Sequence, residues 1–303
     1  MLPLADDRRD QMMPASIKHP GIVVGVDGSV ASQAAVRWAV HEAAMRDVPL
    51  TLVHAVDAAL STWPHAPVPN FEEWLAKRGR AFLDDAVDIA RENAAAAGRP
   101  EVHSYMLFAA AVLTLVDFSK EAEMIVVGCR RGGGPTSFLL GSVSSGLVYH
   151  AHCPVAVVHD ENPPLSDAPV LVGIDGSPAS ELATAIAFDE ASRRRVELLA
   201  LHAWSDREIF ELPGLDWEIV KQQEELSLAE RLAGWQERYP DVKVGRMVVC
   251  DRPARQLIEQ SAIAQLVVVG SHGRGGFAGM LLGSVSAAVV HSARIPVIVA
   301  RQS

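Results

Sequence analysis

One long glycine-rich loop occurs twice in this chain, and it constrains the fold more than any other feature. The second copy lies between Val267 and Ser286, and the first lies between Val126 and Ser144. In each copy a short apolar run ends at a glycine, and the loop then ends in Gly-Ser directly before a helical pattern. A loop of this kind presents backbone N–H groups to an anion at the start of a helix. Because the loop is duplicated, it predicts a binding function better than a single glycine-rich turn does.

The elements around the loops repeat as well. Short apolar runs, typical of buried parallel strands, alternate with segments of helical periodicity from residue 22 to 158 and again from 170 to 300. Asp27 and Asp175 end equivalent runs 148 residues apart, whereas 142 residues separate Gly128 from Gly270. The second copy is therefore shorter between these points, and the loss falls at a proline-rich loop of the first copy. A period this long predicts two tandem domains rather than a solenoid.

Strands and helices that alternate in this way predict an α/β fold, because right-handed crossovers place helices on both faces of a parallel sheet. We expect two tandem, doubly wound, five-stranded parallel-sheet domains of Rossmann-like type, each with the strand order 3-2-1-4-5. Residues 21–159 and 170–303 would form the domains, with a flexible N-terminal tail over 1–20 and a linker over 160–169.

The last strand of each predicted domain is apolar, running from Val155 to Val158 in the first and from Val297 to Ala300 in the second. Both would be terminal edge strands of their sheets. An unpaired apolar edge invites association, so pairing between the two strands is the economical way to cover both.

Composition excludes several classes of protein. The formal charge of −10 and the pI near 5.5 disfavour nucleic acid or an anionic membrane as the main partner. The first 20 residues do not form a signal peptide, and no apolar run is long enough to cross a bilayer. Cys129, Cys153 and Cys250 form no CxxC pair, which indicates a cytoplasmic protein in which Cys129 and Cys250 are small buried hydrophobic residues.

Two unusual features meet at one place in the predicted fold. In a doubly wound sheet the ligand crevice lies beyond the carboxyl ends of the strands, where the strand order reverses. There Asp-Gly follows the first strand (Asp27-Gly28 and Asp175-Gly176), and the glycine-rich loop follows the fourth. Backbone amides, serine hydroxyls and a helix N-terminus favour phosphate. The aspartate suits a ribose hydroxyl, an adenine amino group or a metal carried by the phosphates. Neither a Walker lysine nor GxGxxG after the first strand is present, which disfavours the P-loop and dehydrogenase alternatives.

At these residues the chain resembles the universal stress protein family, specifically its tandem-domain, ATP-binding members, over nearly all of residues 22–300. The family's Gly-x2-Gly-x9-Gly-Ser signature is complete in the second repeat. The resemblance implies that ATP, with or without Mg²⁺, is held by the glycines and serines at its phosphates, by the aspartate at its nucleoside and by a strand-two alanine at adenine. The residues so implied are Asp27, Gly28, Ala55, Gly128, Gly141, Ser142, Val143 and Ser144 in the first repeat, and Asp175, Gly176, Ala203, Gly270, Gly273, Gly283, Ser284, Val285 and Ser286 in the second.

The first repeat departs from the signature at one residue, because Arg131 stands where the second glycine would be. If that position needs a positive φ, a non-glycine residue costs on the order of 1 kcal/mol or more. Gly132 could take over with a shifted loop, or the guanidinium could itself meet a phosphate. We therefore expect two nucleotide sites of unequal strength, the second being the stronger.

The resemblance implies an ATP-binding regulator in stress response or growth control, without fast turnover, that forms a homo-oligomer, most simply a dimer. The sequence shows no Ser/His/Asp set, no paired carboxylates with an argued geometry and no Cys/His metal cluster, which disfavours an enzyme. One alternative is a slow metal-dependent ATPase or phosphotransferase that uses Asp27 or Asp175. A second alternative is a nucleotide-independent scaffold.

Other residues near the loops carry weaker expectations. His54 and His202 lie on apolar strands and are expected to be core histidines with satisfied hydrogen bonds. His272 could face either the phosphates or solvent. A regulatory protein partner would read the loop surface, for which Phe138 and Phe277 are the exposed candidates.

Overall fold

The structure is a computed structural model, and it describes residues 19–56, 70–131, 138–159, 167–204, 217–274 and 282–301. The chain forms two compact units. One comprises Met1–Gly128 with Ala151–Cys153, and the other comprises Cys129–His150 with Pro154–Ser303. The second unit therefore contains the last part of the first sequence repeat, and the units do not coincide with the repeats.

Strands and helices alternate along both repeats. The first repeat contains β1 (Ile22–Gly25), α1 (Val30–Arg46), β2 (Leu50–Ala55), α2 (Phe71–Ala97), β3 (Val102–Leu107), α3 (Ala111–Phe118), β4 (Met124–Arg131), β5 (Phe138–Leu139), α4 (Ser142–His150) and β6 (Val155–His159). The second contains β7 (Val170–Gly173), α5 (Pro178–Arg194), β8 (Leu198–Trp204), α6 (Trp217–Arg238), β9 (Val244–Cys250), α7 (Pro253–Gln260), the 3₁₀ helix η3 (Ser261–Ile263), β10 (Leu266–Gly270), α8 (Ser284–Ser292) and β11 (Val297–Ala300).

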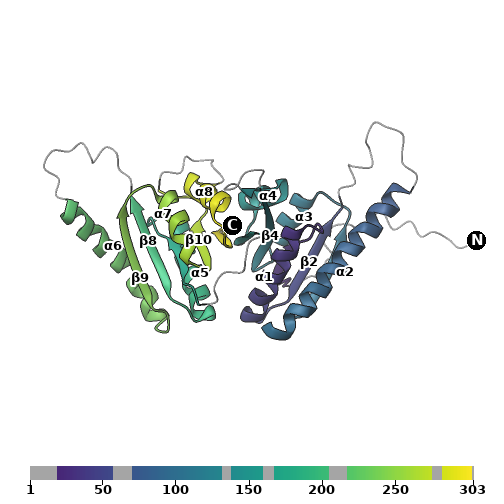
Figure 1. The fold of residues 1–303 in the computed structure, drawn as a ribbon, viewed down its shortest axis with the longest axis horizontal. Coiled ribbons are helices and arrows are strands. Elements are labelled where there is room, and N and C mark those ends of the chain that lie inside the picture. The colour runs from purple at the N-terminus through teal and green to yellow at the C-terminus, as the bar shows by residue number, and fades with distance from the viewer. Residues whose placement is uncertain are drawn as a thin grey trace, which may run out of the picture. The chain divides into compact units, whose positions relative to one another are not determined.

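The sheet of the first unit has the parallel order β3-β2-β1-β4. Ile22, Val23 and Val24 of β1 are fully buried, as expected for a strand covered on both faces. Helix α1 packs against β1 and α2, and α2 lies along β2 and β3 (Figure 1).

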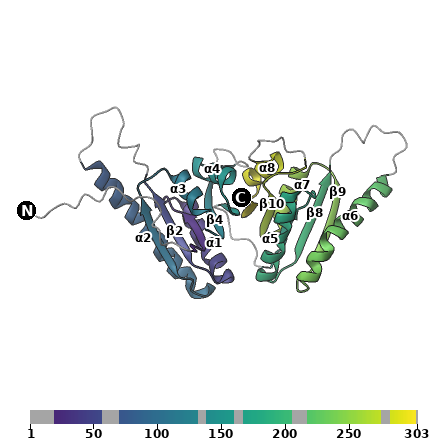
Figure 2. The same cartoon turned by 180° about the vertical axis from the view of Figure 1, so that it is seen from behind.

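The sheet of the second unit has the order β6-β11-β10-β7-β8-β9, in which every neighbouring pair is parallel except β6 and β11. Strands β11-β10-β7-β8-β9 are the fifth, fourth, first, second and third of their repeat, so the predicted order 3-2-1-4-5 is confirmed there. Helix α6 lies beside β9, and the reverse view shows the same arrangement (Figure 2). The predicted doubly wound α/β fold is confirmed.

The predicted pairing of the two apolar end strands is also confirmed. Strands β6 and β11 are antiparallel neighbours, with Val157 opposite Val297 and Ala156 opposite Ile298. All residues of both strands are buried. Each strand thereby covers an edge that would otherwise expose unpaired backbone groups.

Two details differ from the sequence-based prediction. The sequence pattern predicts a helix from Val112 to Glu121, but α3 ends at Phe118. The chain continues in tight turns, in which Glu121 N–H donates to the Phe118 carbonyl. Strand β5, only two residues long, pairs antiparallel with the end of β4 and was not predicted. A pair of residues is too short to show a strand period.

The cysteines are only partly as predicted. Cys129 and Cys153 are buried, but Cys250 is exposed, because it ends β9 at the margin of the sheet. Burial raises the pKa of the Cys129 thiol to about 11 and that of Cys153 to about 12, so both stay as unreactive thiols at neutral pH.

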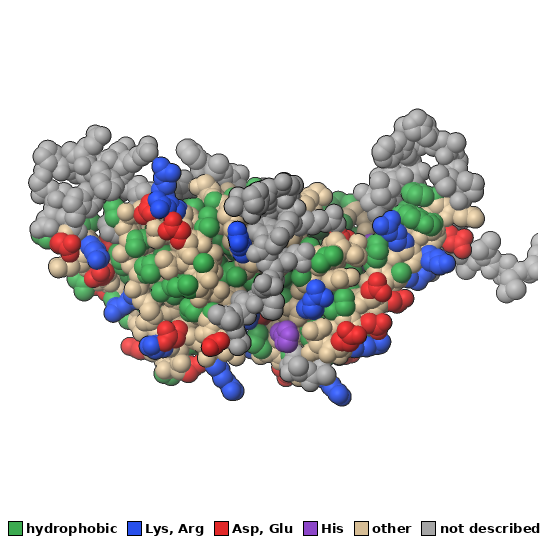
Figure 3. Space-filling model, in the orientation of Figure 1, with side chains coloured by type: hydrophobic (Ala, Val, Ile, Leu, Met, Phe, Trp, Pro, Cys, Tyr) green, Lys and Arg blue, Asp and Glu red, His purple; other side chains and the backbone are tan. Residues whose placement is uncertain are grey.

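The surface carries mixed charge. On the face drawn in Figure 3, acidic and basic side chains are interspersed along the helices. Among the helices that the structure describes, none combines the length and the apolar character needed to cross a membrane.

Candidate functional site

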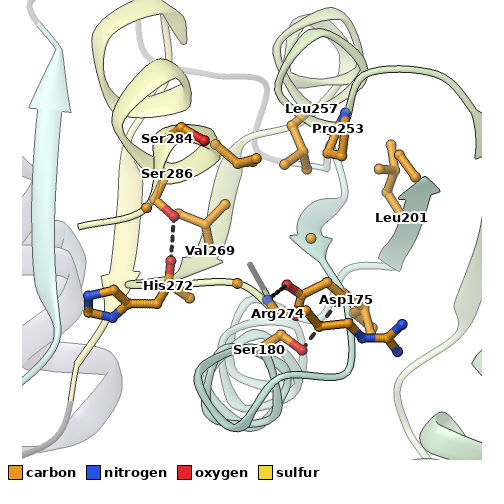
Figure 4. A pocket seen from close by; sticks show the side chains of 17 residues that line it. Asp175, Ser180, Leu201, Pro253, Leu257, Val269, His272, Arg274, Ser284 and Ser286 are labelled. Carbon is orange, nitrogen blue, oxygen red and sulfur yellow. Dashed lines mark hydrogen bonds between the residues drawn. The ribbon is translucent and has the colours of Figure 1, made fainter. Parts of the chain in front are cut away.

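A cavity of about 420 Å³ lies at the carboxyl ends of β7 and β10 (Figure 4). These strands are neighbours in the sheet, and the strand order reverses between them, so the cavity occupies the predicted crevice. Its lining consists of Gly173, Ile174, Asp175, Ser180, Leu201, Ala203, Pro253, Leu257, Val269, Gly270, His272, Gly273, Arg274, Gly283, Ser284, Val285 and Ser286.

The loop after β7 is a tight turn that leads directly into α5. The Asp175 carboxylate accepts a hydrogen bond of 2.9 Å from Ser177 N–H, and Gly176 adopts a φ of +76° that disfavours other residues. Ser177 is the N-cap of α5, where its side chain accepts from Ser180 N–H. The Ser180 hydroxyl oxygen in turn accepts from Gly176 N–H at 3.0 Å. The turn therefore fixes the direction of Asp175.

Asp175 also joins the two loops that border the cavity. Its second carboxylate oxygen accepts a hydrogen bond of 3.0 Å from Arg274 N–H in the loop after β10. Partial burial raises the pKa of the Asp175 carboxyl, but the hydrogen bonds from Ser177, Arg274 and Ser180 outweigh it and hold the pKa below its usual range. The side chain is thus an anion at neutral pH with both oxygens engaged.

The glycines of the β10 loop are required by close approach. A Cβ on Gly270 would lie 2.8 Å from the backbone carbonyl of Ala179, at the start of α5, and one on Gly273 would lie 2.5 Å from Asp175 Oδ2. Neither glycine has a positive φ. Arg131 stands at the equivalent position of the first repeat and would be strained only if that position needed a positive φ. It does not, and Arg131 lies in the extended strand β4, so the expected strain is absent. In the described residues the repeats differ in the length of this strand, since β4 runs to Arg131 whereas β10 ends at Gly270.

The N-terminus of α8 forms another wall of the cavity. Gly283 is its N-cap and contributes no side-chain cap, and Ser284, Val285 and Ser286 form the first turn. N–H groups in the first turn of a helix have no partner within the helix, and the helix dipole favours an anion beside them. The Ser286 hydroxyl donates to the Gly270 carbonyl at 2.5 Å and so ties α8 to the end of β10.

The opposite side of the cavity is apolar. Leu201 and Ala203 come from the end of β8, and Pro253 and Leu257 come from the first turns of α7. Figure 4 shows Leu201, Pro253 and Leu257 at the upper right of the pocket, Ser284 at the upper left, and Asp175 and Arg274 below. The imidazole of His272 points away from the apolar group. The cavity therefore has an apolar side and a side rich in hydrogen-bond donors.

The structure brings together almost all the residues predicted for the second repeat. Of these, Gly176 does not line the cavity. It shapes the turn, and a Cβ added to it would meet the Arg231 side chain. Sequence reasoning missed Ser180, Pro253 and Leu257. Ser180 had a signal, since a serine also stands three residues after Ser29 in the first repeat. The apolar residues of α7 had none beyond helical periodicity.

The structure places the predicted residues of the first repeat at equivalent points. Asp27 accepts from Ser29 N–H at 2.9 Å, Gly28 has a φ of +74°, and a Cβ on Gly128 would meet the Ala31 carbonyl at 2.3 Å. Ala55 ends β2. The residues Gly141, Ser142, Val143 and Ser144 lie at the start of α4, and Ser144 is buried. The loop between β4 and β5, residues 132–137, lies outside the described residues.

The strand-two histidines were predicted to be satisfied core histidines. His202 is buried, whereas His54 is only half-buried, and one ring nitrogen of each lies near a main-chain carbonyl. His54 Nδ1 lies 2.7 Å from the Val26 carbonyl, and His202 Nδ1 lies 2.7 Å from the Ile174 carbonyl. His202 Nε2 additionally lies 3.2 Å from Glu224 of α6. Of the two expected partner-surface residues, Phe277 lies outside the described residues, and for Phe138 only the backbone is described. Within the described ranges, no group of three or more His, Cys, Asp or Glu side chains is placed to hold a metal ion.

Several known proteins resemble this chain. The model of the Universal stress protein family matches residues 21–159 and 168–301. Universal stress protein Rv2005c of Mycobacterium tuberculosis is 61% identical over 290 residues, which cover 94% of this chain and 98% of the relative. Universal stress protein Rv2623 of the same organism is 58% identical, with coverages of 93% and 97%.

A solved structure shares the fold over nearly the whole chain. The crystal structure of a universal stress protein from Archaeoglobus fulgidus is 20% identical, has a TM-score of 0.69, and covers 94% of this chain and 99% of its own. The family model matches both repeats, and the mycobacterial relatives match over almost their full length, so the chain belongs to the universal stress protein family.

Proposed function

We propose that this protein binds ATP in the cavity beside Asp175 and acts as a nucleotide-dependent regulator in stress response or growth control. The observation that carries the proposal is the two-sided cavity at the strand-order reversal. Its volume of about 420 Å³ lies within the range of small-molecule sites, roughly 300–1,000 Å³. One side offers an apolar surface for a base, and the other offers the donors of α8 for phosphates.

Each part of ATP has a matching group. Adenine would lie against Leu201, Ala203 and Leu257, and the phosphates would meet the first turn of α8 with the hydroxyl of Ser284. Asp175, held by the β7 turn, would accept a hydrogen bond from the nucleoside. A magnesium ion would be carried mainly by the phosphates, because both Asp175 oxygens already accept N–H hydrogen bonds.

The same hydrogen bonds favour binding over rapid hydrolysis. A general base is most effective when its pKa lies near the working pH. The pKa of Asp175 is lowered instead, and Arg274 N–H occupies one of its oxygens. We therefore infer slow turnover or none.

We infer further that the first repeat holds a second nucleotide site, which is weaker because its loop departs from the signature at Arg131. Residues 21–159 and 170–303 would then be the two nucleotide-binding domains. A cytoplasmic location and a homo-oligomeric state, most simply a dimer, complete the proposal, and the net charge of −10 supports small anions held by local amides rather than nucleic acid.

Titration calorimetry with Mg²⁺-ATP tests the proposal. We expect Asp175→Ala to remove the stronger binding event, and Asp27→Ala, the same change at the equivalent turn, to leave it in place. Unchanged total stoichiometry and affinity in Asp175→Ala would contradict the assignment. Mass spectrometry of nucleotide carried through purification then separates the outcomes: retained ATP supports a regulator, retained ADP supports hydrolysis, and no nucleotide with no calorimetric signal supports a scaffold.

A further inference from the structure

Both ring nitrogens of the buried His159 face main-chain carbonyls. Nδ1 lies 2.9 Å from the Ile295 oxygen and Nε2 lies 3.0 Å from the Val290 oxygen, and the residue is only 3% exposed. A carbonyl can only accept, so each contact is a hydrogen bond only if the nitrogen carries a proton. The neutral ring has one N–H, whereas the imidazolium has two. Only the protonated form satisfies both contacts.

The strand register explains how the ring reaches this position. Val157 of β6 is opposite Val297 of β11, and two more residues along the antiparallel pair place His159 opposite Ile295. Val290 lies in the last turn of α8, where carbonyls lack a helical partner. His159 thus connects the end of β6 to the C-terminal end of the helix whose N-terminus lines the cavity.

An equivalent contact to the end of α4 is made by an arginine. The offset of 142 residues that relates Gly128 to Gly270 also relates His159 to Arg301 and Val148 to Val290. Arg301 Nη1 donates to the Val148 carbonyl near the end of α4 at 2.7 Å. The same position therefore carries a permanent cation at one helix and a titratable one at the other.

We propose that His159 is a positioning residue for the nucleotide site, and that its protonation strengthens nucleotide binding at the N-terminus of α8. The proposal rests on the proposed function of that cavity. A cation near the C-terminus of a helix and an anion at its N-terminus each interact favourably with the helix dipole and help to hold the helix in position. By linkage, whatever the proton adds to nucleotide affinity, the nucleotide adds to proton affinity.

Other charged groups lie on the surrounding elements, among them Glu181, Asp189, Glu190, Arg193 and Arg194 of α5, which packs against β11. His291 of α8 and Arg294 of the following turn flank the two carbonyls but are themselves exposed. Arg301 follows β11, and the neighbouring strand β4 ends in Arg130 and Arg131. In the described parts of β4, β6, α8, β11 and the turn between the last two, no Asp or Glu is present.

Nucleotide affinity measured against pH tests the proposal. Mg²⁺-ATP is titrated by calorimetry into the full chain from about pH 6 to about pH 8, on both sides of the ordinary histidine pKa of about 6.5. His159→Arg keeps the cation at every pH, and Arg301 shows that the equivalent position accommodates arginine. His159→Gln removes the cation at every pH. We expect the wild type to match the arginine variant at low pH and the glutamine variant at high pH.

The expected size is a two- to fivefold weakening of wild-type affinity across this range relative to His159→Arg, which is about the effect of one charge at a helix end. Titration of ATP itself affects all variants equally and cancels in the ratio. His291→Arg is the matched control, because it places the same change on an exposed residue of the same helix end, and it should retain the wild-type pH profile.

A wild-type to His159→Arg affinity ratio that stays constant with pH would overturn the proposal. If the arginine variant does not fold, the comparison of wild type with His159→Gln decides, since their affinities must converge at high pH and separate at low pH. Absence of ATP binding by the wild type at every pH would instead contradict the proposed function. In that case the melting temperature without nucleotide, measured against pH for the same variants, still tests the contact of His159 with α8, and identical pH profiles would refute it.

Discussion

At the scale of single residues, the signature glycines have different physical roles, and substitution can separate them. A Cβ on Gly270 would lie 2.8 Å from the Ala179 backbone, whereas one on Gly283 would find its nearest atoms at an ordinary 3.4 Å. We expect Gly270→Ala to lower the free energy of unfolding by about 1–3 kcal/mol. Denaturant unfolding measures this, and Gly141→Ala, with no heavy atom within 4 Å of the new Cβ, is the control that should stay near the wild type.

In Gly283→Val, by contrast, we expect nucleotide affinity rather than stability to change. Its new side chain is added at the wall of the cavity without backbone strain, because Gly283 has a φ of −73°. We expect stability within about 1 kcal/mol of the wild type but at least about tenfold weaker Mg²⁺-ATP binding, equivalent to about 1.4 kcal/mol. Calorimetry checks this, and unchanged affinity would show that the phosphates do not lie at the start of α8.

Asp175 should contribute stability that depends on pH. Its folded-state pKa is lowered, so the contribution is complete above the unfolded-state pKa of about 3.9 and is lost as the pH falls through the lower folded-state value. We expect wild type to be more stable than Asp175→Asn at neutral pH and the difference to shrink in acid. Thermal unfolding of both proteins from neutral pH to about pH 3 measures it. A difference that grows in acid would contradict the hydrogen bonds assigned to the carboxylate.

Individual site residues were predictable where their chemistry leaves a local signal. Asp175, Gly270 and Gly283 stand out because a polar or flexible residue interrupts an apolar run, and because each recurs in the other repeat. Leu257 and Pro253 were not predictable as cavity residues, since an apolar residue on a helix looks the same whether it faces the core or a ligand. The contact of His159 with α8 depends on strand register between distant segments, which no local pattern encodes.

At the scale of elements, the pairing of β6 with β11 should be a major source of stability. Val157 is fully buried opposite Val297. An unpaired charge there would be costly, so we expect Val157→Asp to lower the free energy of unfolding by about 3 kcal/mol or more. Val30→Asp is the matched control: Val30 is 58% exposed in the first turn of α1, where an acid is tolerated or favoured. Equal effects in denaturant unfolding would show that β6 is dispensable.

Elements with long apolar periodicity were predicted well, whereas very short strands and helix ends were predicted less well. The sequence patterns predict a helix from about Phe71 to Ala97 and strands over 102–107 and 266–270. The bounds of α2, β3 and β10 match these, because apolar periodicity runs to their ends. Strand β5 and the early end of α3 depend on local backbone pairing and turns, which composition does not reveal.

At the scale of the whole molecule, the path of the chain predicts cooperative unfolding. Residues Cys129–His150 of the first repeat pack in the same compact unit as the entire second repeat. Melting either repeat alone would therefore break up that unit. We expect scanning calorimetry of the full chain to show one transition, although separately folding domains commonly show two.

Nucleotide binding should then shift the single unfolding transition of the whole chain. A ligand that binds only the folded state adds about 2.7 kcal/mol at a concentration of 100 times its dissociation constant. Because α8 and β11 share a unit with β6 and α4, saturating Mg²⁺-ATP should raise the whole transition, and Asp175→Ala should lose most of that shift. The control is the same scan with Asp27→Ala, which should keep it. Two resolved transitions, of which ATP moves only one, would show that the repeats unfold independently and that the pairing of β6 with β11 does not couple them.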